Sequence, residues 1–283
     1  MCSEISGNAG RWGVADTRRE YLDAYGKVIW QMDERGLITR MSYDNPTGAV
    51  TQRIDDVDTG LYGDVPAGWA TPSGGGKNLI TDYEHDDLGR ITQTLSPSRT
   101  MDLDGEATVV RNASWTVFDD VNHITYSATG IATGAGLTYQ YQLNNSVSIT
   151  KMDAGGQVNE QVQATAPSTS GTLAEIIDTA GGGAAAFPQT NYTRWSTNQY
   201  TDCCLAASQR VYHDIPESGA GEPITNYNET DFGYNVMKRR NRTVSPGGYH
   251  HGCRLRSAGN GDRQLHRHQR RRRHSRRPDW RRE

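Results

Sequence analysis

The sequence predicts an all-β protein in which repeated β-hairpins form a curved ribbon or partial β-shell, followed by a disordered Arg-rich C-terminal tail. Three observations predict this class: a recurring Asp/Gly turn pattern, alternating apolar and polar residues after it, and a composition that suits half-exposed strands. Only 34% of the 283 residues are hydrophobic and mean hydropathy is -0.76, which leaves little material for a large compact core. The 14 Tyr and 31 Gly, against 3 Phe, favour strands and tight reversals.

A turn pattern of Asp, two variable residues, Gly, one residue and then Val or Ile occurs four times. The copies are Asp23–Val28, Asp33–Ile38, Asp86–Ile91 and Asp153–Val158. Asp at the first position of a type I turn accepts bonds from the backbone N–H groups ahead of it, and Gly three residues later supplies the positive φ that closes the turn. The predicted structural turn residues, together with the related segment that begins at Tyr43, are Asp23, Gly26, Asp33, Gly36, Tyr43, Asp44, Gly48, Asp86, Gly89, Asp153 and Gly156.

The stretches that follow these turns have the period of a β-strand. After Gly26, the residues Val28, Trp30 and Met32 fall on one face. After Gly36, one face is expected to carry Leu37, Met41 and Tyr43, and after Gly156 the apolar Val158 and Val162 alternate with polar residues. Period-two alternation over four to eight residues is typical of a half-buried strand.

An aromatic residue often precedes the turn. Tyr21 lies five residues before Gly26 and Tyr43 five before Gly48, so the two tyrosines are 22 residues apart. This period fits a strand–turn–strand unit that must stack on its neighbours to bury its apolar face. The clearest copies of an aromatic followed by the turn are Tyr43–Gly48, His85–Arg90 and Phe232–Arg239, the last with Asn in place of Asp and Lys in place of Gly.

These copies resemble the YD repeat of RHS-family proteins, over about half of residues 17–248. The resemblance implies a β-hairpin ribbon that spirals into a hollow shell, which in relatives encloses a C-terminal toxin or forms a large extracellular domain. Neither the family's terminal core motif nor a distinct toxin domain is visible in this chain, so the resemblance implies shell wall. The implied partners are neighbouring repeats of a longer chain, with an encapsulated toxin domain or surface glycans. The implied location is the cell surface or the extracellular space.

Composition shifts divide the chain into seven segments. They are an irregular N-terminus (1–16), YD-type hairpins (17–58), a Gly/Pro loop (59–78), a β-hairpin region (79–165), a linker (166–189), a β-hairpin region with a degenerate YD repeat (190–248) and a basic disordered tail (249–283). Within the linker we expect a short helix over Thr172–Thr179 and a flexible run over Gly181–Ala186.

The tail breaks sharply with the rest of the chain. Residues 249–283 carry 12 Arg against 3 acidic residues, a net charge of +9, so the remainder of the chain is at -12. Such a run favours nucleic-acid binding through phosphate neutralisation. A shift of the coding frame near Gly248 is the competing hypothesis, since a frame moved by one base can encode further repeat-like text. On that hypothesis nucleic acid is not an expected partner.

The sequence predicts no catalytic, cofactor-binding or metal-binding residues, and no cofactor. Gly74-Gly75-Gly76-Lys77 fails as a phosphate loop because Asn78 stands where Ser or Thr should bind magnesium. Neighbouring carboxylates such as Asp86 and Asp87 point to opposite faces of a strand and do not converge. The chain has no apolar run of the ~20 residues that a membrane span requires, and its start lacks an export signal. The four cysteines show no zinc spacing.

Three aromatic residues, Tyr192, Trp195 and Tyr200, keep a second function open. Exposed rings stack on sugars, while rings on adjacent strands pack against each other. The predicted function is therefore a non-catalytic structural segment of a cell-surface or secreted RHS/YD-type protein. The alternative is a carbohydrate- or surface-binding module that uses these rings, and the third possibility is nucleic-acid binding through the tail.

Overall fold

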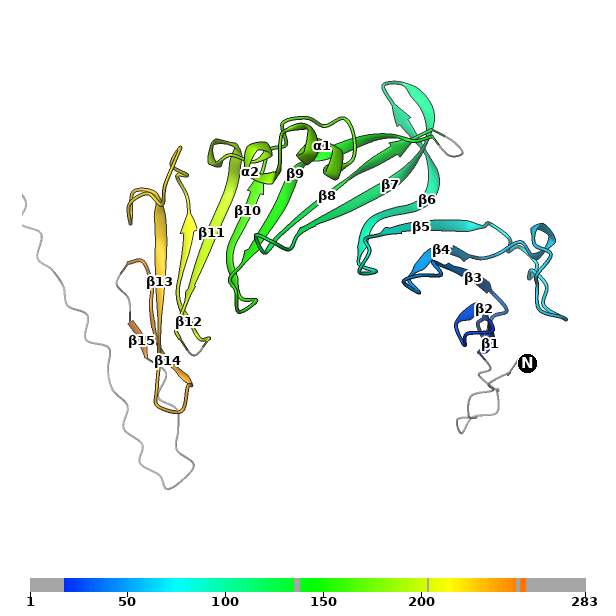
Figure 1. Cartoon of the computed structure of the whole chain (residues 1–283), viewed down its shortest axis with the longest axis horizontal. Coiled ribbons are helices and arrows are strands. Elements are labelled where there is room, and N and C mark those ends of the chain that lie inside the picture. The colour runs from blue at the N-terminus through cyan, green and yellow to red at the C-terminus, as the bar shows by residue number, and fades with distance from the viewer. Residues whose placement is uncertain (1–17, 135–137, 203, 248–249, 253–283) are drawn as a thin grey trace, which may run out of the picture.

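The protein is one long antiparallel sheet that follows the order of the chain. The computed structural model describes residues 18–134, 138–202, 204–247 and 250–252. Within these ranges fifteen strands pair strictly in sequence order, each antiparallel to the next, with no crossover. Figure 1 shows that the sheet bends into an open arch, with β1 and β15 at its two ends. The predicted all-β hairpin ribbon is confirmed.

The elements have the following bounds. The strands are β1 (Arg19–Leu22), β2 (Val28–Met32), β3 (Ile38–Tyr43), β4 (Val50–Asp55), β5 (Leu79–His85), β6 (Ile91–Leu103), β7 (Glu106–Asp119), β8 (Ile124–Thr133), β9 (Gln140–Met152), β10 (Val158–Ala164), β11 (Tyr192–Tyr200), β12 (Ala206–Tyr212), β13 (Tyr227–Tyr234), β14 (Arg240–Val244) and β15 (His250–Gly252). The helices are η1 (Thr59–Leu61), α1 (Leu173–Thr179), α2 (Gly183–Ala186) and η2 (Gln189–Asn191).

Because the strands run in simple alternation, the connections divide between the two edges of the sheet. Each connection from an odd-numbered strand to the next even-numbered one lies at the same edge, which we call the turn edge. It is formed by residues 23–27, 44–49, 86–90, 119–123, 153–157, 201–205 and 235–239. The opposite edge holds the other connections, including the two longest, between β4 and β5 and between β10 and β11.

The N-terminal strands share a small core that the predicted Gly/Pro loop covers. Trp30, Ile38 and Ile54 are buried on one face of β2, β3 and β4. Tyr62 and Trp69, from the connection between β4 and β5, pack against them. The segment predicted as a loop is thus irregular in its backbone but anchored through its aromatic side chains.

Arginine and aromatic rings reinforce this contact. The rings of Trp30 and Tyr62 meet edge to face with centroids 5.9 Å apart. The guanidinium of Arg40 lies 5.4 Å from the Trp30 ring and 5.0 Å from the Tyr62 ring. Arg40 also pairs with Asp64 at 3.1 Å, so one side chain holds the loop to the sheet twice.

The second and larger core contradicts one prediction, because residues 166–189 are more than a linker. Leu173, Ile176 and Ile177 of α1 are buried in a core cluster that also contains residues of β6–β13. The helix begins with a capping box, in which Thr172 and Glu175 bond each other's backbone N–H groups at 3.3 and 2.8 Å. Figure 1 shows α1 and α2 beside the middle strands of the arch.

The run Gly181–Ala186, predicted to be flexible, contains α2 and is packed. Ala186 is fully buried and Phe187 stacks on Tyr126 with centroids 5.7 Å apart. Gly183 lies so close to Tyr126 that an added Cβ would collide with the phenol ring. The prediction failed because glycine is needed here to let the backbone approach the Tyr126 ring closely. The sequence alone does not distinguish a glycine with this role from one in a flexible segment.

The burial of β3 also differs from the expected pattern. Ile38 is fully buried whereas Leu37 is 38% exposed. Ile38 pairs with Met32, and Arg40 pairs with Trp30, so the covered face takes these residues and leaves Leu37 outside. Strand β3 begins one residue later than the alternation after Gly36 predicts. Such a shift moves each side chain to the opposite face of the sheet.

A buried arginine joins the two cores. Strand β6 pairs with β5 from Ile91 to Leu95 and with β7 from Gln93 onward, and its register with β7 shifts at a bulge between Leu95 and Ser98. The guanidinium of Arg111 fills the resulting gap. It donates to the carbonyls of Ser96 (2.7 Å), Leu95 (2.8 Å) and Ile80 (2.9 Å), to the Asp82 carboxylate (2.5 Å) and to the Tyr139 hydroxyl (3.1 Å).

This arrangement keeps Arg111 charged. Desolvation opposes the charged form, but the hydrogen bonds with Tyr139 and Asp82 outweigh it and raise the pKa of Arg111. Since the side chain is only 8% exposed, the five bonds replace a hydration shell that burial has removed.

The two ends of the chain bear on other predictions. His250–Gly252 form β15 beside β14, so these three residues of the segment predicted to be disordered are in a strand. The predictions for residues 1–16, for most of the tail and for its nucleic-acid binding or frameshift lie outside the described residues. In the part of the chain that the structure describes, no helix is long and apolar enough to cross a membrane.

Candidate functional site

The turn edge repeats one hydrogen-bonded turn. At Asp23, one carboxylate oxygen accepts from the N–H groups of Tyr25 (2.9 Å) and Lys27 (2.8 Å), and Gly26 has φ +82°. The same bonds occur at Asp86 with Gly89 (φ +77°) and at Asp153 with Gly156 (φ +77°). The turn at Asp33 and Gly36 has the same geometry but lies at the opposite edge.

The turn at Asp44 carries one extra residue, as its sequence indicates. The Asp44 carboxylate accepts from the N–H (3.0 Å) and the hydroxyl (2.7 Å) of Thr47, and Gly48 has φ +73°. These bonds lower the pKa of Asp44, the side-chain bond with Thr47 most strongly. An added Cβ at Gly48 would lie 3.0 Å from the Lys27 ammonium nitrogen, so the first two turns touch along the edge.

Two further turns on this edge have other residues in the Asp and Gly positions. In the degenerate copy, Asn235 accepts from the N–H groups of Met237 and Arg239 at 3.0 Å, and Lys238 takes the positive φ (+59°). At Thr201 the hydroxyl accepts from the N–H of Leu205 at 3.2 Å, and Cys204 has φ +66°. Sequence analysis missed the second turn, since only its spacing from the neighbouring strands signals it.

Replacing Lys238 by glycine should stabilise the protein. A positive φ costs an L-residue about 1 kcal/mol that glycine avoids, so Lys238→Gly should raise the free energy of unfolding by about 0.5–1 kcal/mol. Urea denaturation followed by circular dichroism measures the change. Arg239→Gly is the matched control in the same turn, since its φ is not positive. Equal effects of the two substitutions would contradict the assignment of strain to Lys238.

At three turns of this edge, the residue just before the turn links one repeat to the one before it. The hydroxyls of Tyr43, Tyr200 and Tyr234 donate to the carbonyls of Val28 (2.8 Å), Val158 (2.8 Å) and Ala206 (2.9 Å). Each acceptor is the first residue of the preceding even-numbered strand. The same interaction thus recurs at three places along the sheet and gives the tyrosine of the pattern a structural role.

The register corrects the expected equivalence of Tyr21 and Tyr43. A bulge precedes each of these turns, and the residue after the bulge is Leu22 in the first turn and Tyr43 in the second. Tyr21 instead pairs with Trp30. The extra residue in the Asp44 turn made Tyr21 and Tyr43 equally distant from their glycines, although they are not at equivalent positions.

Arg90 joins two adjacent turns on the edge. Its guanidinium bonds Asp86 at 2.7 Å and Asp120 at 2.7 and 2.8 Å, and lies 4.0 Å from the centroid of the Phe118 ring. The bonds from Arg90 lower the pKa of Asp120. They also lower the pKa of Asp86, together with its backbone bonds, against an opposing contribution from desolvation.

These carboxylates predict sensitivity to acid. A lowered pKa in the folded state means that the stabilisation is complete above the ordinary value of 3.8 and is lost as the pH falls through the folded value. The melting temperature should therefore hold between pH 7 and about pH 5 and fall below about pH 4. In thermal melts, Asp86→Asn with Asp120→Asn should flatten this fall, whereas Asp87→Asn, which makes no ion pair with Arg90, should not. An unchanged fall in the double variant would contradict the assignment.

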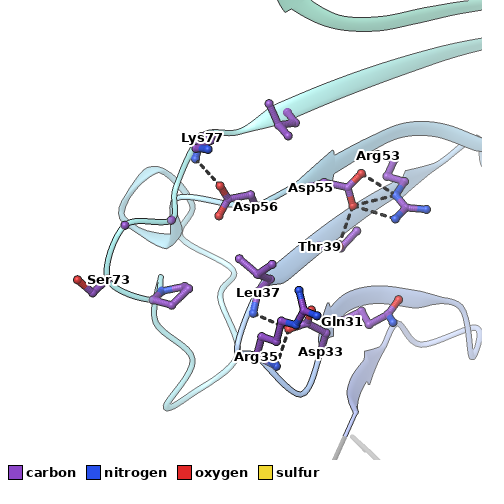
Figure 2. A pocket seen from close by; sticks show the side chains of 14 residues that line it. Gln31, Asp33, Arg35, Leu37, Thr39, Arg53, Asp55, Asp56, Ser73 and Lys77 are labelled. Atoms are coloured by element: carbon purple, nitrogen blue, oxygen red, sulfur yellow. Dashed lines mark hydrogen bonds and ion pairs between the residues drawn. The ribbon is translucent and has the colours of Figure 1, made fainter.

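A hollow lies near the opposite edge and is drawn in Figure 2. Its volume is about 680 Å³, and its wall carries three acidic and three basic side chains. The acids are committed to local structure: Asp33 holds its turn, Asp55 pairs with Arg53 at 2.9 Å, and Asp56 accepts from Gly76 and Lys77 N–H groups at 2.8 and 3.2 Å. The backbone N–H groups of the glycine-rich loop therefore face a protein carboxylate.

The three aromatic residues proposed for glycan contact pack into the sheet. Trp195 is 7% exposed, so its predicted exposure is wrong. Its ring stacks on Tyr212 with centroids 3.8 Å apart and planes at 16°, and Tyr192 meets its edge at 5.9 Å. Tyr200 is half-buried, and its hydroxyl donates a hydrogen bond to the Val158 carbonyl. Packing between neighbouring strands, the competing interpretation, accounts for these contacts.

Within the described ranges, few other side chains are placed to bind a metal ion or to react as a thiol. No group of three or more His, Cys, Asp and Glu residues there converges to hold a metal ion. Cys204 is an exposed free thiol at a turn. Cys2, Cys203 and Cys253 lie outside the described residues.

Comparison with known proteins gives distant structural resemblances. No family model and no curated protein matches the chain. The crystal structure of TcdB2-TccC3 without the hypervariable C-terminal region matches at 13% identity and a TM-score of 0.31, over 84% of this chain and 12% of that one. The Photorhabdus luminescens Tc holotoxin pore matches at 10% identity and a TM-score of 0.25, over 83% of this chain and 14% of that one. The chain thus spans about an eighth of the length of these structures.

Proposed function

We propose that this chain is a non-catalytic wall segment of a larger exported protein of the RHS/YD-repeat type. Its role is architectural, because each hairpin covers the edge of the one before it. The result is a continuous curved sheet that encloses or displays another part of the complete protein. Its partners are then the neighbouring repeats of a longer chain, with an enclosed toxin domain as the cargo of the complete protein.

The recurrence of one inter-repeat contact carries this proposal. The tyrosine hydroxyls of β3, β11 and β13 all bond the first carbonyl of the preceding strand, although these strands are far apart in the sequence. Contacts that repeat with the hairpin, and that involve only adjacent hairpins, are typical of a repeat wall. A site that served one ligand would differ from its counterparts along the sheet.

The two terminal strands support the same proposal. β1 and β15 each pair with a neighbour on one side only within the described residues. A strand at the end of such a meander can pair with one more strand on its outer edge. Further repeats on either side would continue the meander without changing its geometry.

Backbone hydrogen exchange on a longer product of the same gene tests the proposal. The amides of Arg19–Leu22 are compared in this chain and in one extended upstream by the adjacent coding sequence. We expect at least tenfold slower exchange at alternate residues of β1 in the extended chain, because a new strand would pair with its open edge. The amides of Trp30, which lies inside the sheet, serve as the internal control.

Two outcomes would contradict the proposal. One is unchanged exchange in β1 of the extended chain, which would mean that no repeat precedes β1 and pairs with it. The other is selective binding on a glycan array that Tyr200→Phe or Trp195→Ala removes without a loss of β-sheet signal, which would favour the carbohydrate-binding alternative.

A further inference from the structure

A small groove on the turn edge combines an apolar floor with negative charge. It lies among the ends of β7, β8 and β9 and has a volume of about 370 Å³. Phe118, Ile124 and Met152 line it, and Met152 is 37% exposed. The three turns that meet here are residues 86–90, 119–123 and 153–157, which lie far apart in the sequence but adjacent along the edge.

The charges around this groove are unequal. Asp119, Asp120 and Asp153 line it against the single guanidinium of Arg90, which leaves a net formal charge of -2 with His123 neutral. Asp120 faces solvent with 63% of its side chain exposed. Bonds from Asn122 to both oxygens of Asp119 hold that carboxylate in place.

Two exposed apolar side chains stand on the turns that flank the groove. Leu88 is 74% exposed and Val121 is 89% exposed. Single exposed apolar residues are ordinary on a protein surface. Here, however, each belongs to a turn that also supplies a lining residue, Arg90 in one turn and Asp120 in the other, to a hollow with an apolar floor and an acidic rim, a combination that suits one kind of ligand.

We propose that this groove binds a cationic segment of a separate partner polypeptide, one that carries Arg or Lys together with apolar side chains. A long basic side chain would lay its methylene stem along Met152 and Phe118 and bring its charge to Asp119 and Asp120. Apolar side chains next to it would contact Leu88 and Val121. This assignment is independent of the proposed wall function, because it rests on the charge and shape of this groove alone.

Charge complementarity favours a polypeptide over a polyanion. Residues 1–248 of the chain carry a net charge of -12, so nucleic acid or an anionic membrane would be repelled. Among the described residues, no three or more His, Cys, Asp and Glu side chains converge to hold a bare metal ion, and the bonds from Arg90 and Asn122 leave the groove with its net negative charge. A basic segment gains from the net charge without displacing these bonds.

Fluorescence anisotropy with the full chain and a labelled probe tests the proposal. The probe is the peptide Gly-Arg-Leu-Arg-Ser-Arg-Leu-Arg-Gly, and its counterpart with Glu in place of Arg is the negative control. We expect saturable binding at about 50 mM NaCl that weakens at about 300 mM, and none of the Glu peptide. Leu88→Ser with Val121→Ser should weaken binding about tenfold, and Asp120→Asn several-fold.

Matched variants test whether the probe binds this groove specifically or is attracted to any exposed apolar or acidic residue. Val236→Ser with Met237→Ser removes equally exposed apolar residues from another turn on the same edge, and Asp104→Asn removes a carboxylate at the opposite edge. Neither should change affinity by more than about twofold. Circular dichroism melts check that all variants remain folded.

Three results would overturn the assignment. Binding that ignores the Leu88, Val121 and Asp120 substitutions would place the site elsewhere. Equal losses in the matched variants would indicate non-specific attraction. Tighter probe binding when Arg270–Arg273 of the full chain are all changed to Gln would show that the groove's occupant is the chain's own basic segment and not a separate partner.

Discussion

Replacing Arg111 by methionine should lower the free energy of unfolding by about 3–5 kcal/mol. The substitution keeps a side chain of similar length but leaves Asp82 without its ion-pair partner and removes the Arg111 donor from three backbone carbonyls. An unsatisfied buried polar group costs about 1–3 kcal/mol, and here several lie together. Lysine should restore only part of the loss, because one ammonium cannot reproduce the planar set of donors.

Chemical denaturation measured by tryptophan fluorescence and by circular dichroism gives this change. Because Arg111 stands between the two cores, the two signals should separate in Arg111→Met, with the N-terminal core unfolding first. Arg53→Met is the matched control: Arg53 also pairs with an aspartate, but half of its side chain is exposed, so the loss should stay below about 1 kcal/mol. Similar losses in the two variants would disprove a special role for Arg111.

Replacing Trp30 by alanine should cost about 3–5 kcal/mol. The side chain is fully buried, and it supplies the ring that Tyr62 and Arg40 both contact. Its loss therefore leaves a cavity and also removes the anchor of the segment between β4 and β5. This segment should become susceptible to protease while the middle strands of the sheet stay protected.

Limited proteolysis followed by mass spectrometry reads out the effect of Trp30→Ala. We expect new cleavage between residues 59 and 78, and a lower melting temperature of the N-terminal core. Tyr25→Ala removes an aromatic residue that is 86% exposed, and should change neither. If Trp30→Ala destabilised the protein without new cleavage in this segment, the anchoring role of Trp30 would be wrong.

Local chemistry explains why the turns could be predicted from sequence. Asp23 and Gly26 form their turn through bonds that span four residues, and the same is true of Asp86 with Gly89. No distant part of the chain is needed for such a turn, so its residues specify it alone. The recurrence of these turns along the sequence predicted the hairpin ribbon.

The covers over the two cores could not be predicted in this way. Leu173 and Tyr62 are buried only because strands elsewhere in the chain offer an apolar face to them. Their own segments are rich in Gly and Ala or in Gly and Pro, and such composition indicates loops and linkers. Long-range packing outweighed this local signal.

The groove on the turn edge was missed for a related reason. Arg90, Asp120 and Asp153 come from three separate turns, and only the register of the sheet brings them together. Sequence analysis treated the neighbouring carboxylates as isolated turn residues. The sequence shows that residues 88 and 121 are apolar. Their exposure on adjacent turns of one edge is known only from the structure.

The strict sequential order of the strands has a consequence for how the protein is made. Since β-strand n always finds its partner in strand n−1, each new hairpin can join the growing sheet as soon as it leaves the ribosome or a secretion channel. Loop-closure entropy is small for such local pairings, and chains dominated by them fold quickly for their size. A polypeptide of this design needs no distant segment to pair its first strands, so it can assemble gradually from one end during synthesis.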